Sequence, residues 1–226
     1  MSFSPIFKRA QLRKGGADGL LQLLPSIASN DQLIAQGDDR YLSKMCRVIN
    51  NAGFNWKVIG NKWPQFEEAF FDFNLQKLAM LSPDQWDGYM NDKRVVRHSQ
   101  KIKAVYDNTV FILEIARMHG SFGKFLAEWP NDDVVGLLSY LKKHGSRLGG
   151  NTGQWFLRSA GKDTFVLTTD VIRGLQEAGL DIADNPTSKR DLVKIQHQFN
   201  QWQDEMGMPY AHLSRILACA TGSNRL

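Results

Sequence analysis

Residues 137–173 read LLSYLKKHGSRLGGNTGQWFLRSAGKDTFVLTTDVIR, and this stretch decides the fold. Leucines at helical spacing lead into a basic last turn, and we expect this helix to end at Gly145. The run Gly149-Gly150-Asn151-Thr152-Gly153 then forms a tight turn that feeds into a second helix beginning near Thr152. A glycine-rich turn that opens a helix presents unpaired backbone N–H groups to an anion, and the helix dipole adds to the attraction. The pattern therefore predicts two helices joined by a hairpin at 148–153.

The natural anion for this hairpin is a phosphate of a nucleic acid backbone, because lysines flank the glycines. We expect the phosphate contacts to come from Gly149, Gly150, Asn151, Thr152 and Gly153, with Lys142 and Lys143 beside them. An ordinary two-helix turn closed by a glycine has the same pattern, so the residues alone leave both interpretations open.

A second basic cluster begins the longest periodic stretch of the chain. Arg97 and Lys101 belong to it, and we expect both to contact DNA phosphates. The alternative for each of them is a solvated helix start.

Composition restricts the class of protein. The chain has 226 residues, a net charge of +5 and a pI near 9.2, which suits a polyanionic partner. Its two cysteines, Cys46 and Cys219, form no CxxC pair, so we expect neither a disulfide framework nor a cysteine-rich zinc site, in a reducing cytoplasm. No apolar run is long enough to span a membrane, and the first residues lack the apolar core of a signal peptide.

Helical periodicity dominates the whole chain, and no segment alternates as a strand does. We expect an all-α fold of about ten helices with short connections. The predicted organisation is a single domain of two lobes over residues 1–226. Residues 38–185 form the core with the hairpin, and 1–37 and 186–226 supply flanking helices.

Four blocks follow one another along the chain: NAGFNW with NKWPQFEEAFFDF (51–56 and 61–73), VVRHSQKIKA (95–104), GSFGKF (120–125) and LLSYLKKHGSRLGGNT (137–152). Together they resemble the DNA-3-methyladenine glycosylase I family. The wider group is the helix-hairpin-helix DNA glycosylases, and the resemblance implies their all-α, two-lobed fold with the active site between the lobes. It also implies release of alkylated purines in base excision repair, by base flipping and hydrolysis of the N-glycosidic bond.

The resemblance also suggests how the flipped base is bound. Trp56 stands where the family has its base-stacking tryptophan, and Phe54 is close to it in sequence. An N-methylated purine carries positive charge, so an aromatic face favours it over an undamaged base. A tryptophan at a helix junction is more often a core residue, which is the alternative.

The catalytic carboxylate is harder to place. Val48 occupies the position of the family's functional glutamate. Many members of the wider group have an essential aspartate about 20 residues after the hairpin, and Asp170 lies there, although it also suits a helix cap. Bifunctional members have a lysine where this chain has Thr152, so we expect a monofunctional enzyme without a Schiff-base step.

Other family features are missing from this chain. The zinc-binding cysteines and histidines have no counterpart, so we predict no structural zinc, and no cofactor is expected. The expected partner is double-stranded DNA with a damaged base, bound by a monomer. A catalytically silent DNA-binding relative, or a glycosylase for a different lesion, is the alternative.

Overall fold

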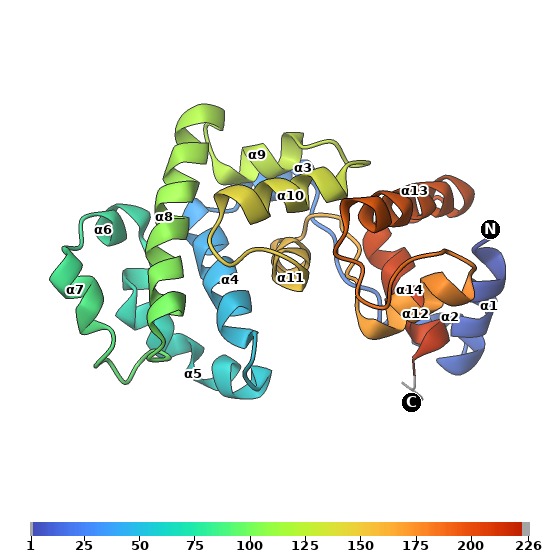
Figure 1. Cartoon of the computed structure of the whole chain (residues 1–226), viewed down its shortest axis with the longest axis horizontal. Helices are drawn as coiled ribbons and strands as arrows, with labels where there is room; N and C mark the ends of the chain where they lie inside the picture. The colour runs from blue at the N-terminus through green and yellow to red at the C-terminus, as the bar shows by residue number, and fades with distance from the viewer. Residues whose placement is uncertain (1, 223–226) are drawn as a thin grey trace.

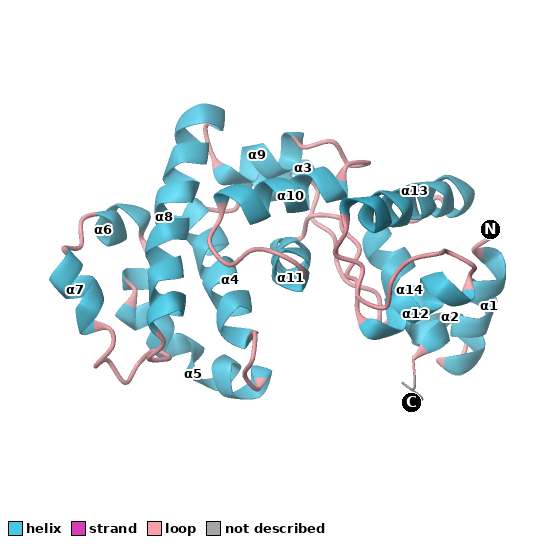
Figure 2. Ribbon diagram, viewed as in Figure 1, coloured by secondary structure: helices cyan, strands magenta, loops and turns pink. Residues whose placement is uncertain are grey.

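The computed structural model describes residues 2–222, in which all regular secondary structure is helical and no strand is present (Figure 2). This confirms the predicted all-α class. The elements of this part of the chain are α1 (Ser4–Arg13), α2 (Ala17–Leu21), α3 (Asn30–Ala35), α4 (Asp38–Asn51), α5 (Trp56–Ala69), the 3₁₀ turn η1 (Phe71–Phe73), α6 (Leu75–Ala79), α7 (Pro83–Gly88), α8 (Ser99–His119), α9 (Phe122–Glu128), α10 (Val134–His144), α11 (Asn151–Ala160), α12 (Thr169–Glu177), α13 (Lys189–Met206) and α14 (Tyr210–Thr221).

Side-chain caps fix where many of these helices begin. Ser29 and Ser82 form capping boxes with Gln32 and Gln85, three residues further on in each case. The described residues hold more helices than the ten or so expected, because several are a single turn or little more. The helices α2, α3 and α6, of five or six residues, are too short for a periodic pattern to reveal.

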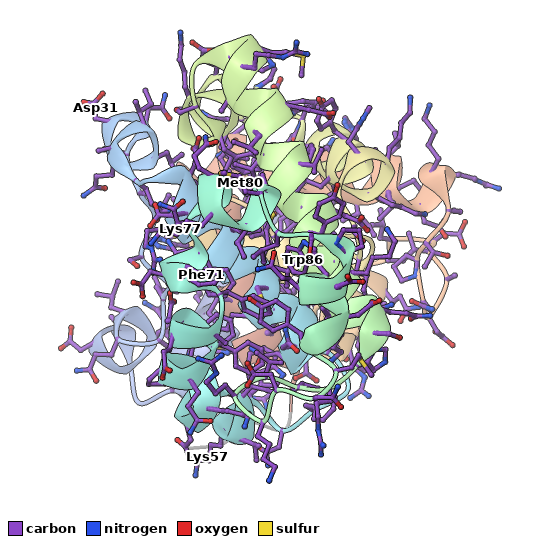
Figure 3. The ribbon with its side chains drawn as sticks, turned by 90° about the vertical axis from the view of Figure 1, so that its left-hand side faces the viewer. Asp31, Lys57, Phe71, Lys77, Met80 and Trp86 are labelled. Carbon is purple, nitrogen blue, oxygen red and sulfur yellow. The ribbon has the colours of Figure 1, made fainter. Side chains whose placement is uncertain are left out.

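The first lobe is built around an aromatic core. Its buried hydrophobic cluster runs from Tyr41 to Ala160, with Trp63 stacked on Phe66 and Phe73 at centroid distances of 5.0 and 5.7 Å. In Figure 1 its helices α4 to α8 occupy the left of the molecule. Figure 3 views its outer face, where Lys77 lies 5.9 Å from the ring centroid of Phe71.

The second lobe brings the two ends of the described chain together. Helices α1 and α2 pack with α12, α13 and α14 at the right of Figure 1, around a separate buried cluster. The guanidinium of Arg13 donates to the carbonyls of Ala220 and Gly222, which ties α1 to the end of α14. Val171 and Leu175 belong to this cluster, so α12 lies in the second lobe and not in the first, where the predicted boundary at residue 185 had placed it.

Helix α11 lies between the two lobes in Figure 1, and the chain enters it from α10. Phe156 and Leu157 of α11 are buried in the first cluster. Leu138 of α10 packs against both clusters. The hairpin that joins α10 to α11 is therefore held at the junction of the lobes.

Candidate DNA interface and base-binding cleft

The hairpin leaves the start of α11 uncapped. Gly150 is the N-cap residue, with φ +56° and ψ −137°, and a Cβ there would point into open space. Only glycine adopts such a conformation without strain. A glycine cap offers no side chain to the first N–H groups of the helix, so they are available to an anion. By contrast Gly153 is buried, and a Cβ there would collide with the carbonyl oxygen of Leu148.

A buried asparagine on the long helix α8 fixes the hairpin. The Asn108 amide donates from Nδ2 to the Ser146 carbonyl at 3.0 Å, and its Oδ1 accepts from the Ser146 N–H at 2.8 Å. Asn108 is 1% exposed. This residue was not predicted from the sequence, where its only signal is a polar side chain on the apolar face of a helix.

The lysines of the hairpin are exposed. Lys142 extends along Gly149, with its Cγ 3.3 Å from where a Cβ on that glycine would lie, and it lines a groove with Gly150 and Asn151. Lys143 is exposed in the last turn of α10, and Arg97 is exposed in the segment before α8. Their expected phosphate contacts remain predictions.

Lys101 has a different place from the one expected of a phosphate contact. It is 5% exposed, and its ammonium group donates to the carbonyls of Asn50 and Ala52 at 3.1 and 2.8 Å. The same group lies 4.4 Å from the ring centroid of Phe54. Burial lowers the pKa of Lys101, and the charge of Arg147 adds to the effect. We therefore correct its role: Lys101 stabilises the end of α4 and the loop between α4 and α5 by binding their carbonyl groups.

An open cleft of about 1080 Å³ lies beside the hairpin. Two indoles stand in it: the Trp56 ring, 54% exposed, meets the Trp155 ring edge-on at a centroid distance of 5.3 Å. Asn151 and Thr152 of the hairpin also line this cleft, together with Phe54 and Val48. The structure thus brings the predicted base platform and the predicted anion site to one place.

Trp155 was missed in the sequence. It follows Thr152 by three residues, so both face the same side of α11. That spacing after the hairpin is the signal that could have identified it.

Asp170, the expected catalytic residue, does not line the cleft. It lies in the first turn of α12, where Thr168 is the cap, and its carboxylate faces the backbone of Gly222. The reason is its position four residues before Gly174, because residues so spaced share a helix face. Gly174 packs on Leu217 of α14, and the same face turns Asp170 away from the cleft.

Two acidic residues that are close in sequence to Trp56 form hydrogen bonds and ion pairs outside the cleft. Glu67 accepts hydrogen bonds from Arg40, Ser43 and Trp63, and Glu68 pairs with Arg94 at 2.9 Å. Neither lines the cleft.

Within residues 2–222 no three His, Cys, Asp or Glu side chains come together in a way that could hold a metal ion. Cys46 and Cys219 are buried in different clusters. No helix in this part of the chain has the length and apolarity needed to cross a membrane.

Comparison with known proteins identifies the family. A model of the methyladenine glycosylase family matches residues 33–144, which include α4, α5 and the cleft wall at Val48 and end with α10, just before the hairpin. The chain is a divergent member of this family. A DNA-3-methyladenine glycosylase of Haemophilus influenzae is 25% identical over 96 residues, or 42% of this chain. The match spans about half, 52%, of the length of that relative.

Solved structures support the same fold. A 3-methyladenine DNA glycosylase I from Staphylococcus aureus superposes with a TM-score of 0.51 at 24% identity, over 68% of this chain and 85% of its own. An 8-oxoguanine glycosylase/lyase from Methanocaldococcus jannaschii reaches a TM-score of 0.57 at 14% identity, over 97% and 98%. The second comparison covers both lobes, which confirms the two-lobed helix-hairpin-helix glycosylase fold.

Proposed function

We propose that the protein is a monofunctional DNA glycosylase that flips a damaged base out of duplex DNA into the cleft and hydrolyses its N-glycosidic bond. The observation that carries this proposal is the position of Trp56 and Trp155 beside the uncapped start of α11. An enzyme that acts on a base must extrude it from the stack, and therefore needs a stacking platform and a phosphate anchor close together.

The two parts of the site match these needs. The N–H groups after Gly150 and the ammonium group of Lys142 suit a phosphate, which positions the strand without reading its sequence. The exposed Trp56 ring suits a stacked base, and Phe54 extends the apolar wall. Thr152 offers no amine, so the proposed reaction is simple hydrolysis without a covalent intermediate.

We propose alkylated purines of the 3-methyladenine type as the damaged bases. The support is the family, whose relatives in Haemophilus influenzae and Staphylococcus aureus are named for 3-methyladenine. We further propose that the protein works as a monomer on double-stranded DNA in the cytoplasm.

The decisive experiment is incubation with duplex DNA containing 3-methyladenine and 7-methylguanine, followed by chromatography of the released bases. We expect free methylated purine and an intact strand carrying an abasic site. Normal duplex binding with no base released from this DNA or from an 8-oxoguanine duplex points to a catalytically silent relative. Release of 8-oxoguanine alone identifies a different lesion.

A further inference from the structure

The charged residues that line the cleft are all basic. They are Lys44 and Arg47 of α4, Lys57 of α5 and Arg158 of α11, and no described lining residue is acidic. None of the four forms an ion pair with another residue in the described part of the chain. The charged side chains that line the cleft therefore sum to a net positive charge.

Arg158 contributes a partly buried guanidinium. Its Nη2 donates to the Thr164 carbonyl at 2.7 Å and to the Ser214 hydroxyl at 2.9 Å, whereas its Nε–H is buried without a partner among the described residues. Burial lowers the pKa of Arg158 to about 10, so the group stays protonated at neutral pH. The nearby Asp163 is already engaged by the N–H groups of Tyr210 and Ala211.

The two cations of α4 are also without an acidic partner. Lys44 donates to the side-chain carbonyl of Gln36. Arg47 lies over the Trp63 ring, with its guanidinium carbon 5.5 Å from the centroid. Glu67, which also contacts Trp63, accepts hydrogen bonds from Arg40 and Ser43 and does not line the cleft.

This charge matters for the reaction proposed above, because breaking the bond changes the charge of the base. When the bond between C1′ and the base nitrogen breaks, the electron pair leaves with the base. A cationic methylated purine becomes neutral, and a neutral base becomes an anion, so the base loses one unit of positive charge in either case. C1′ gains that positive charge until water adds to it. Fixed cations that lie nearer the base than C1′ therefore stabilise the departing base more than the intact nucleotide.

We propose that Lys44, Arg47 and Arg158 promote base release electrostatically, by favouring the electron pair that the departing base takes, with no carboxylate required in the cleft. Water adds to C1′ of the sugar and loses a proton to solvent, which balances the reaction. The proposal rests on the proposed glycosylase function and deepens it. It explains how a cleft with Val48 in its wall can act without an acidic residue.

The test combines neutralised cations with an added carboxylate. We choose Lys44→Gln, Arg47→Gln and Val48→Glu, with Val48→Gln as the control for bulk. Lys124→Gln is the control for charge, because Lys124 is paired with Glu128 on α9, outside the cleft lining. Release of 7-methylguanine from duplex DNA is followed at saturating enzyme in a single turnover. Binding to a duplex with an abasic site, and thermal unfolding, are measured separately.

We expect Lys44→Gln and Arg47→Gln each to slow release by about tenfold, which corresponds to about 1.4 kcal/mol of transition-state stabilisation. Val48→Glu is expected to slow release relative to Val48→Gln, because its carboxylate neutralises the neighbouring cations. Native rates in the two glutamine variants of the cations overturn the proposal, and so does faster release by Val48→Glu. If the native protein itself releases no base, the proposed function fails, and the present inference fails with it.

Discussion

Asn108 holds Ser146 by two hydrogen bonds, one to its carbonyl and one from its N–H, across 38 residues of sequence. The asparagine is buried in the long helix α8, and the serine lies between the end of α10 and the hairpin. Asn108 thus fixes the chain at the start of the proposed phosphate-binding turn to the core of the first lobe.

Removing this side chain should loosen the hairpin. Asn108→Ala leaves two backbone groups of Ser146 without partners, and we expect a loss of about 1–3 kcal/mol in the free energy of unfolding together with weaker DNA binding. Denaturant titration and fluorescence anisotropy with duplex DNA measure the two effects. Thr109→Val is the control, because Thr109 is equally buried in α8 but bonds only to Val105 within its own helix. Unchanged DNA affinity in Asn108→Ala means that the hairpin keeps its shape without the anchor.

DNA binding should depend on the backbone conformation of Gly150 and not on the room around its Cα atom. Gly150→Ala is expected to cost about 1–3 kcal/mol of stability, because an alanine at φ +56° and ψ −137° is strained, although its Cβ meets no atom. The strain distorts the uncapped turn, so duplex affinity should fall. Gly16→Ala is a matched control, since Gly16 is also an uncapped N-cap with φ +100° in open space. A control that weakens DNA binding equally excludes a specific role for the hairpin.

The exposed indole of Trp56 should serve binding, not folding. Trp56→Ala is expected to lower the binding free energy of a damaged base by about 1–3 kcal/mol, the usual scale for stacking of a base on an aromatic ring. More than half of the ring is in solvent, so the melting temperature should change little. Binding to duplexes with and without the lesion, combined with thermal unfolding, tests both statements. A large drop in melting temperature identifies Trp56 as a packing residue instead.

Substitution of Lys142 and of Lys101 should have different effects on the salt dependence of DNA binding. Lys142→Ala removes an exposed ammonium group beside the hairpin, so we expect the slope of log affinity against log salt to fall by about 0.9, the contribution of one phosphate contact. Lys101→Met should leave this slope unchanged and should lower stability, because it frees the carbonyls of Asn50 and Ala52. Equal losses of slope in both variants contradict the corrected role of Lys101.

Asp170→Asn should leave base release at the native rate, because the carboxylate faces Gly222 and not the cleft. We expect a stability loss of about 0.3–1 kcal/mol, since the variant removes a negative charge from the first turn of α12. Single-turnover base release measures the rate, and denaturant titration measures the free energy of unfolding. A strongly reduced rate in a fully folded variant restores Asp170 as the catalytic residue.

The local features of the site could be predicted from sequence because they depend on neighbouring residues. The glycines of 149–153 and the basic turn before them indicate the hairpin, and the family blocks indicate Trp56. Both were found in the structure beside one cleft.

Features that depend on distant partners could not be predicted in this way. The spacing from Gly150 to Asp170 fixes a length of chain but not the direction in which α12 turns, which its packing on α14 decides. Lys101 was predicted to be a surface cation. The sequence does not show that the end of α4 and the loop after it cover the face of α8 on which Lys101 lies. Asn108 is recognisable only through its partner in the hairpin.

The pairing of α1 with α14 has a consequence for how the chain acquires its structure during synthesis. The Arg13 guanidinium reaches the Ala220 carbonyl at 2.6 Å across 207 residues, whereas the first lobe is built from one continuous stretch. The first lobe can therefore fold while the ribosome is still translating the rest. Phe3 and Ile6 of the N-terminal segment complete their packing only when α13 and α14 have been made. We therefore expect the cleft wall of α4 and α5 to assemble early and the second lobe, with its high contact order, to close in a slower step.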